Sequence, residues 1–516
     1  MSASDEISIN VRFCSLCEKL LNGVDEDAIP ALSQELDGIA CDVAKDEELR
    51  TTAGADQPTV WPGLRGLWHV LAEEATAHED DESTRTIITS TCRFTRNLVA
   101  GVAKNQENAY ENEPALRRIL HTYSSWSAAQ DPESFRVMRM AVQTLSNMVT
   151  ANESLMTRLW DTHMNLPEEQ AIFVRVLSSP DPRTILYALV LLVNCIHENG
   201  GRQALLARTR SGARMCITLL DRMTNLHDAE ESSDSGRAFD YGYHLFAHLF
   251  EGGFASDLYG NLKVAGEVIV SHQTILLKLL DSYLQSSPSQ NVFPGMVPML
   301  TTCFFELSAY SSHTIRRAVG TEGADSTAGS DVIRESPDAI LPKACEALVL
   351  VTQCMASIML ASQSTDSDDA PMTISCKLFR EAAWSDGRIL AEHAVELLRL
   401  LDIFLPRINF GKPVLQPGRE AFQGPTTNAT GFSYLKRDLV RLLGILCHKH
   451  KDTQDRIRKC DGIPVIMNMC VIDEHNPYLR EHAILTLHNL LEENDENQAV
   501  VNSMQPTRLP VDRDKP

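Results

Sequence analysis

The stretch DPESFRVMRMAVQTLSNMV, residues 131–149, decides the fold class of this chain of 516 residues. It opens with Asp131 and Pro132, a pairing that is typical of a helix start. The Asp oxygen accepts hydrogen bonds from the unpaired amides of the first turn, and Pro at the first helical position loses none. The apolar residues that follow recur at spacings of three and four, so one stripe faces a core while Arg139 stays in water. The stretch therefore predicts an amphipathic helix.

The same pattern returns twice, as DPRTILYALVLLVNCI from Asp181 and as NPYLREHAILTLHNLL from Asn476. All three copies carry an Asn, with a Leu two residues before it and a small Ala six residues before it. A small Ala allows a neighbouring helix to approach closely. Self-similarity of this kind predicts a repeat architecture.

A second signature follows these helices, because a Gln stands nine positions after the Asn at several sites. The residues in between are polar, so we expect the helix to break and a new one to begin. The pairs are Asn97 with Gln106, Asn194 with Gln203, and Asn489 with Gln498. Gln454 has the same layout, although Ile445 takes the place of the Asn.

The spacing of these units favours one class of repeat. Positions 97, 147 and 194 are 50 and 47 residues apart, and positions 445 and 489 are 44 apart. Armadillo and HEAT units have about 40 to 47 residues. We therefore predict an all-α fold, an armadillo/HEAT-like right-handed α-solenoid with disordered acidic loop insertions. Such stacked units present a long concave surface, which commonly binds proteins.

Composition narrows the function classes. Hydrophobic residues make up 43% of the chain and aromatic residues only 6%, which favours helices over sheets. The net charge of −22 argues against a general nucleic-acid binder. Thirteen scattered cysteines suit free thiols in a reducing compartment, so we expect a cytoplasmic protein. The apolar runs at 185–195 and 347–361 are shorter than the roughly 20 residues of a membrane span, and we expect buried solenoid helices there.

Changes in composition suggest a domain organisation. We expect N-terminal armadillo-like repeats at 1–224, an acidic loop at 225–240, and degenerate middle repeats at 241–406. Disordered loops are expected near 320–340 and 361–372. A Pro/Gly-rich linker at 407–431 then leads to a C-terminal domain at 432–503 and a tail at 504–516.

The last seventy or so residues, from Phe432, resemble the C-terminal domain of the ataxin-10 family. The phrases KRDLVRLLG, DGIP and NLLEENDENQ carry the resemblance. It implies an armadillo-type solenoid without enzymatic activity, a cytoplasmic location, and roles in cytokinesis and signalling through protein contacts. Ile445 departs from the family, which tends to have Asn there. The acidic insertions suggest a fungal branch of the family.

The Asn residues at the helix ends are candidates for a protein-binding groove: Asn97, Asn147, Asn194 and Asn489. In armadillo proteins that carry nuclear-import cargo, such an Asn pairs with a Trp four residues earlier. Here those positions hold Arg93, Gln143, Val190 and Leu485, so an import receptor is not expected. Another peptide could still use the groove. The favoured interpretation is a local structural role, such as a helix-end cap or a hydrogen bond between repeats.

The motifs typical of metal-binding and catalytic sites are weak in this sequence. Cys14 and Cys17 form a CxxC that could be half of a metal site, but no second pair has matching spacing, so we expect both to pack on one face of the first helix. His244 and His248 lie one helical turn apart without the Glu of a zinc protease, which favours an aromatic helix face. With no phosphate loop or nucleophile elbow, we assign no catalytic, cofactor-binding or metal-binding residue.

Three hypotheses follow. The first is a non-enzymatic protein-interaction scaffold that regulates cytokinesis or signalling, with other proteins and no nucleic acid as partners. The second is a regulator, exchange factor or chaperone of a G protein. The third, a metal-homeostasis protein, depends only on 13 Cys and 16 Met residues. The C-terminal units are also candidates for pairing with another copy of the chain.

Overall fold

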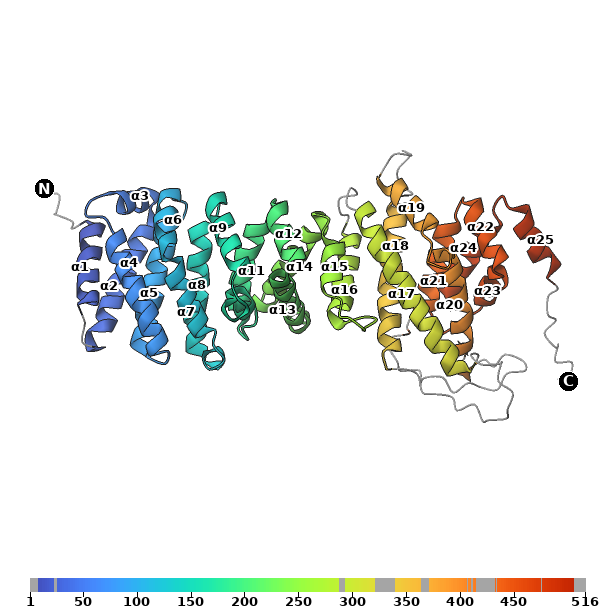
Figure 1. Cartoon of the computed structure of the whole chain (residues 1–516), viewed down its shortest axis with the longest axis horizontal. Coiled ribbons are helices and arrows are strands. Elements are labelled where there is room, and N and C mark those ends of the chain that lie inside the picture. The colour runs from blue at the N-terminus through green and yellow to red at the C-terminus, as the bar shows by residue number, and fades with distance from the viewer. Residues whose placement is uncertain are drawn as a thin grey trace, which may run out of the picture. The chain divides into compact units, whose positions relative to one another are not determined.

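A computed structural model describes residues 8–22, 26–286, 293–320, 339–362, 371–405, 407–409, 412–413, 432, 434–474 and 476–504. The chain falls into two compact units, Met1–Asn261 and Leu262–Pro516, which are described separately. Both consist of stacked helices (Figure 1). A single short antiparallel pair of strands, β1 (Ile408–Asn409) and β2 (Lys412–Pro413), is the only sheet in the described residues. The all-α, armadillo-like fold predicted from the sequence is confirmed.

The N-terminal unit is built of repeats of three helices, which we call the first, second and third helix of each repeat. Equivalent helices of successive repeats lie in one layer, so the unit has three layers. The second-helix layer contains α1 (Ile9–Leu21), α4 (Trp61–Ala77), α7 (Glu113–Tyr123), α10 (Ile172–Leu177) and α13 (Arg210–Leu226). The third-helix layer contains α2 (Ile29–Lys45), α5 (Glu82–Val99), α8 (Pro132–Val149), α11 (Pro182–Ile196) and α14 (Asp234–Glu251). In both layers each helix packs on the next.

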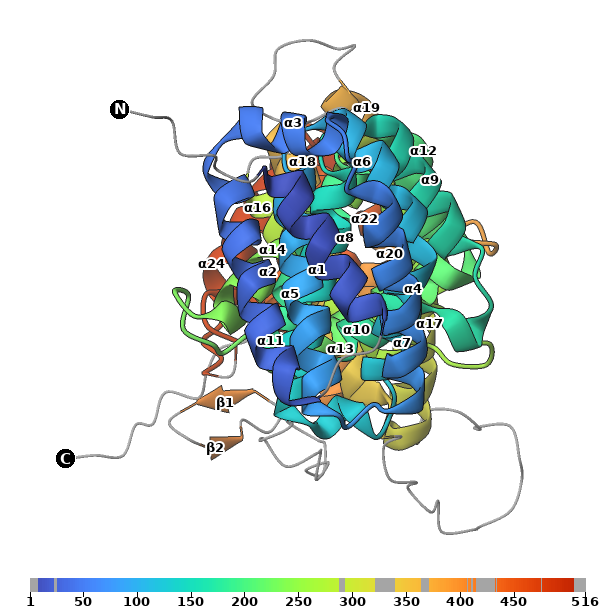
Figure 2. The same cartoon turned by 90° about the vertical axis from the view of Figure 1, so that its left-hand side faces the viewer.

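The first helices of this unit are short: α3 (Glu47–Ala55), α6 (Ala103–Ala109), α9 (Glu153–Met164), α12 (Gly200–Arg208) and α15 (Ala255–Asn261). Figure 2 shows α3 and α6 at one edge, above α1, α2 and α4. Single 3-10 turns lie in the connections: η1 (Glu26–Ala28), η2 (Tyr110–Asn112), η3 (Ala128–Gln130) and η4 (Glu168–Gln170).

The C-terminal unit has the same three layers. Its third-helix layer contains α16 (Ser271–Gln285), α18 (Leu341–Ser362), α21 (Leu435–Cys447) and α24 (Leu479–Leu491). Its second-helix layer contains α17 (Phe293–Val319), α20 (Leu390–Phe404) and α23 (Gly462–Met469). The first helices are α19 (Pro371–Glu381), α22 (Lys451–Lys459) and α25 (Asp495–Ser503).

Helix starts follow the predicted chemistry in two of the three quoted copies. The Asp131 side chain accepts from the amide of Glu133, and the Asp181 side chain accepts from the amide of Thr184. The prediction for the third copy is wrong, because α24 begins at Leu479. There the Asn476 side chain donates to Asp473 over 2.9 Å and closes a separate turn.

The turns between third and first helices share one backbone feature. The residue four positions after the Asn position has a positive φ in each repeat that carries the signature, which confirms the predicted helix–turn–helix punctuation. These residues are Gly101 (75°), Ala151 (60°), Glu198 (49°), Lys449 (48°) and Glu493 (52°). The left-handed conformation reverses the chain direction in a few residues.

The most apolar helix is α18. The segment Leu341–Ala361 is long and apolar enough to cross a membrane by length and composition. In the structure α18 packs against α16, α17 and α21, and Leu348, Val351 and Met355 are fully buried. This packing agrees with the buried solenoid helix expected from the sequence.

The boundaries expected from composition differ from those observed. The acidic loop expected at 225–240 is shorter, because α14 already begins at Asp234. The Ser233 side chain accepts from the amide of Gly236, and Asp234 favours the first turn of a helix through its charge. The division at Asn261 lies inside the expected middle region, 241–406. Most of the loops expected near 320–340 and 361–372, of the linker 407–431 and of the tail 504–516 lies outside the described residues.

Candidate protein-binding face

Three of the four candidate Asn side chains form hydrogen bonds between successive third helices. Asn147 donates from Nδ2 to the backbone oxygen of Arg96 over 3.2 Å, and Asn489 donates to that of Gly444 over 3.0 Å. In both cases the acceptor immediately precedes the equivalent position of the previous repeat. Asn97 donates in the same way to Ala40 over 2.9 Å. The inter-repeat hydrogen bond favoured from the sequence is therefore present at these three positions.

In α8 and α24 a Thr three residues before the Asn forms a second hydrogen bond to the previous third helix. We call this hydrogen bond the Thr rung. Thr144 donates from Oγ1 to the backbone oxygen of Cys92 over 2.9 Å, and Thr486 donates to that of Val440 over 2.9 Å. Both Thr side chains are buried, so each bond satisfies polar groups that water does not reach. The two units thus use the same pair of side chains to fix adjacent third helices.

Two of the four Gln residues of the second signature connect a first helix to the following third helix, whereas Gln203 and Gln498 donate to the backbone oxygens of Ile196 and Leu491 in the preceding third helix. Gln106 donates from Nε2 to the backbone oxygens of Asn147 and Thr150, each over 2.9 Å. Gln454 donates to the backbone oxygen of Asn489 over 2.8 Å. The Asn that caps the next first helix then donates to the Gln oxygen: Asn152 to Gln106, and Asn494 to Gln454.

The Asp residues at the helix starts also pair with Arg on the previous third helix. Arg139 on α8 contacts Asp181 through Nε at 2.7 Å, and Arg85 on α5 contacts Asp131 at 2.8 Å. Burial would raise the pKa of Asp181, but the hydrogen bonds from Arg139 and Thr184 outweigh it and lower that pKa. These residues are therefore structural and are not available to a partner.

Asn194 differs from the other three. It occupies the same place on α11, but among the residues that the structure describes its side chain has no hydrogen-bond partner, and it is half-buried. The Thr rung is also missing, because Leu191 stands at that position and is buried. The Asn194 amide therefore remains open to water and to a ligand.

Half-buried side chains also lie on α5, α8 and α11 within two helical turns of the repeated Asn position. We call the set Arg96, Gln143, Tyr187, Val190 and Asn194 the third-helix face; all five are half-buried. Arg96 donates from Nη1 to the Gln143 oxygen over 2.7 Å. Burial and the charge of the nearby Arg93, which is itself paired with Asp37, lower the pKa of Arg96. The face can offer amide donors and acceptors together with a guanidinium group.

The cysteine and histidine motifs lie elsewhere. Cys14 contacts the backbone oxygen of Thr59 at 3.7 Å, and Cys17 is buried where α1 packs on α4. Burial raises the pKa of Cys17 to about 12, which keeps it a thiol. His248 contacts His197 edge-on at 5.2 Å, whereas His244 is exposed. Within the described ranges no three His, Cys, Asp or Glu side chains are arranged to hold a metal ion.

The family model and the curated relatives that match this chain point to the same family. Residues 435–515 match the family model described as the spinocerebellar ataxia type 10 protein domain. Ataxin-10 of Homo sapiens is 31% identical over 176 residues, which cover 31% of this chain and 35% of that protein. An ataxin-10 homolog of Dictyostelium discoideum is 37% identical over 90 residues, 16% of this chain and 15% of that protein.

These matches confirm the resemblance that the C-terminal sequence shows. The matched segment spans about a third of the length of the human relative. Among solved structures, the crystal structure of SYS-1 aligns with 96% of this chain and 95% of its own, at 10% identity and a TM-score of 0.36.

Proposed function

We propose that this chain, which carries the C-terminal domain of the ataxin-10 family, is a non-enzymatic scaffold that binds an extended segment of a partner protein on the third-helix face. The observation that supports this most strongly is the Asn194 side chain. Asn194 has the same position in its repeat as Asn97, Asn147 and Asn489, whose side chains donate hydrogen bonds to the previous third helix. The Asn194 side chain has no hydrogen-bond partner within the described residues.

The chemistry of the face suits a peptide backbone. An extended segment carries backbone N–H and C=O groups that must be satisfied when water is displaced. The Asn194 amide offers one donor group and one acceptor to such a segment. Tyr187 and Val190, half-buried on the same helix, provide apolar contact area beside it.

The guanidinium of Arg96 adds a preference for acidic side chains. It lies beside Gln143 on the neighbouring helix, so a carboxylate of the partner can approach both side chains. Charge-assisted hydrogen bonds of this kind are stronger than neutral ones. The face thus favours a segment with at least one Asp or Glu.

In the cell we propose a cytoplasmic scaffold for cytokinesis or signalling. This part rests on the family resemblance, which covers the C-terminal region and about a third of the human relative. Regulation of a G protein is the alternative. Purified chain that accelerates nucleotide release from a G protein captured with it would favour that alternative.

Self-association is a second part of the proposal, supported by the outer side of α24. Ile484 is 50% exposed and Leu485 is 58% exposed, and α24 is the last third helix in the described residues. The positions equivalent to Ile484 in α8 and α11, Val142 and Leu189, are buried. Sedimentation velocity should show an oligomer that Ile484→Glu dissociates; a monomer at all concentrations would contradict it.

Affinity capture from cell lysate tests the binding face. The variant carries Val190→Glu and Asn194→Ala, which change the face without removing a hydrogen bond of the fold. Its matched control is Glu107→Ala, at an exposed position of α6. The double variant should lose a partner that the wild type and the control both retain. Equal capture by all three proteins would refute the proposed face.

A further inference from the structure

The second-helix layer of the N-terminal unit contains one short helix. α10 has 6 residues, whereas its neighbours α7 and α13 have 11 and 17. The end of α9, the segment after it, the start of α10 and the first residues of α13 line a pocket of about 150 Å³. This pocket belongs to the opposite helix layer from the third-helix face and contains none of its residues.

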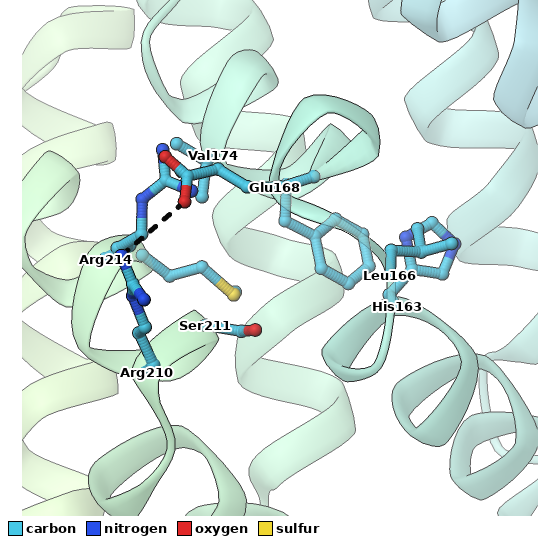
Figure 3. Close-up of a pocket in the computed structure, with 10 residues that line it drawn as sticks. His163, Leu166, Glu168, Val174, Arg210, Ser211 and Arg214 are labelled. Carbon is cyan, nitrogen blue, oxygen red and sulfur yellow. Dashed lines mark ion pairs between the residues drawn. The ribbon is translucent and has the colours of Figure 1, made fainter.

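The two ends of the pocket differ in chemistry. Figure 3 shows Glu168, Arg210 and Arg214 gathered at one end, and His163 with Leu166 at the other. The rest of the lining includes the apolar side chains Ala171, Phe173, Val174 and Met215. Phe173 and Met215 are buried, so they form a fixed floor. The pocket is therefore an apolar slot with a cationic rim.

The carboxylate of Glu168 occupies the place at this rim where a carboxylate of a ligand would pair with the two arginines. Its carboxylate lies 3.1 Å from Arg214 and 3.8 Å from Arg210. The Glu168 side chain is 56% exposed and the Arg210 side chain is 90% exposed, so water screens these pairs and little energy holds them. An incoming carboxylate can replace that of Glu168 at small cost.

The opposite end contains an unused polar atom. The His163 side chain is 1% exposed, and its Nε2 lies 3.0 Å from the buried carboxylate of Glu113. Its ring stacks on Phe173 with centroids 4.4 Å apart. Nδ1 has no hydrogen-bond partner within the described part of the chain. That atom has almost no accessible surface, so His163 contributes its stacked aromatic ring to this end of the pocket.

The size of the pocket selects the ligand. Sites for small molecules typically measure about 300 to 1,000 Å³, so this pocket is too small for most metabolites. It matches a single apolar side chain of a peptide. We propose that the pocket binds an apolar residue of a partner protein that is followed by an acidic residue. The acidic side chain pairs with Arg210 and Arg214, and the apolar side chain packs against Phe173 and Met215.

This inference deepens the proposed function by naming a second binding site and its peptide chemistry, and it rests on that function only in taking the ligand to be a protein segment. The experiment uses the purified full chain and synthetic peptides. If no peptide binds the pocket, the capture experiment on the third-helix face is unaffected. If capture fails, the peptide experiment on the pocket can still succeed.

Methyl NMR provides a direct readout, because the Met215 side chain lines the pocket. The full chain is labelled with 13C at the methionine methyl groups, and Met215→Leu identifies the Met215 signal. The probes are acetyl-Leu-Glu-amide, acetyl-Leu-Gln-amide, acetyl-Gly-Glu-amide and inorganic phosphate. We expect acetyl-Leu-Glu-amide to shift the Met215 signal saturably, and the Gln and Gly peptides to bind at least tenfold more weakly.

Substitutions at the rim test how much the two arginines and Glu168 each affect peptide binding. Arg210→Gln combined with Arg214→Gln should weaken binding of acetyl-Leu-Glu-amide at least tenfold. Glu168→Gln should strengthen it severalfold, because the competing carboxylate is gone. The matched control, Arg237→Gln at an exposed position of α14, should bind like the wild type.

Several outcomes would overturn the proposal. One is a Met215 signal that acetyl-Leu-Glu-amide does not move at 10 mM, which is about the weakest binding that such a site would need. Another is an equal shift with acetyl-Leu-Gln-amide. If inorganic phosphate shifts Met215 as strongly as acetyl-Leu-Glu-amide, the pocket takes a bare anion and the peptide proposal is wrong.

Discussion

Asn489 on α24 donates a hydrogen bond from its side chain to the backbone oxygen of Gly444 on α21 over 3.0 Å. The bond repeats in the other unit between Asn147 and Arg96 at 3.2 Å. A side chain that recurs at a fixed place in the repeat therefore serves the stacking of helices. The same residue type becomes available for binding only where the bond is missing, as at Asn194.

This contrast predicts that the same substitution has a large effect on stability at Asn489 and a small one at Asn194. Asn489→Ala should lower the free energy of unfolding by about 1 to 3 kcal/mol, because it leaves the buried Gly444 oxygen with only the weak Cys447 thiol as a donor. Asn194→Ala should change it by less than about 0.5 kcal/mol, since its amide makes no hydrogen bond in the fold. Urea unfolding followed by circular dichroism measures both. Equal losses would show that Asn194 is also structural.

The close approach of α21 and α24 gives a second prediction. A Cβ at Gly444 would lie 2.5 Å from Oγ1 of Thr486, so Gly444→Ala must displace the Thr rung. We expect a loss of about 1 to 3 kcal/mol in the free energy of unfolding. Gly38→Ala is the control, because Gly38 lies within α2 with no atom within 4 Å of its Cβ position. That change should stabilise by about 0.5 to 1 kcal/mol. A Gly444→Ala variant as stable as the wild type would contradict the packing.

A buried lysine connects the end of α20 to α21. The Lys436 side chain is 1% exposed; its Nζ donates to the backbone oxygen of Leu405 over 2.7 Å and lies 3.7 Å from Asp402. Burial lowers the pKa of Lys436.

Lys436→Ala should lower the free energy of unfolding by on the order of 3 kcal/mol, because Asp402 loses a partner and the Leu405 oxygen loses its donor. Lys377→Ala, at a side chain that is 73% exposed, should be nearly neutral when measured in the same urea titration. If both variants unfold at the wild-type midpoint, the buried contact contributes nothing to stability.

Much of the fold could be predicted because it depends on short-range patterns. The Asp181–Pro182 pair encodes its own helix start, since the capping bond reaches only to Thr184. The Asn476–Pro477 pair looks the same in sequence, yet Asp473 captures the Asn476 side chain, and no rule on capping foresees this competition. The early start of α14 could not be predicted, because acidic residues are typical of both loops and the first turns of helices.

The candidate site was harder to predict because it depends on contacts between repeats. Arg139 and Asp181 are 42 residues apart, so only the stacking brings them together. The four Asn residues look equivalent in sequence, and the Thr position does not separate them: Phe94 precedes Asn97 as Leu191 precedes Asn194, yet Asn97 keeps its inter-repeat hydrogen bond. The pocket beside Phe173 and Met215 gave no signal, because it arises from the shortness of α10 relative to its neighbours.

The Arg139–Asp181 pair predicts how stability depends on pH. The pKa of Asp181 is lowered in the folded chain, so its charge stabilises the fold above its unfolded pKa of about 4. That stabilisation is lost as the pH falls through the lower, folded pKa. Asp181→Asn keeps a good capping residue and removes only the charge.

The free energy of unfolding of Asp181→Asn should therefore lie about 1 to 3 kcal/mol below that of the wild type at pH 7, and the gap should narrow below pH of about 4. Urea titrations at several pH values measure the gap. In an Arg139→Met background most of the difference should disappear. A gap that stays constant from neutral to strongly acidic pH would exclude a contribution from the Asp181 charge.

Site-specific photo-crosslinking tests the central claim most directly. A benzophenone amino acid is placed at Tyr187, on the third-helix face, or at Glu107, exposed on α6. After irradiation in lysate, the account predicts a discrete crosslinked partner from position 187 that is absent from position 107. The crosslink should also weaken when Asn194→Ala is introduced. No crosslink from position 187, or the same product from both positions, would contradict the claim that this face binds a partner.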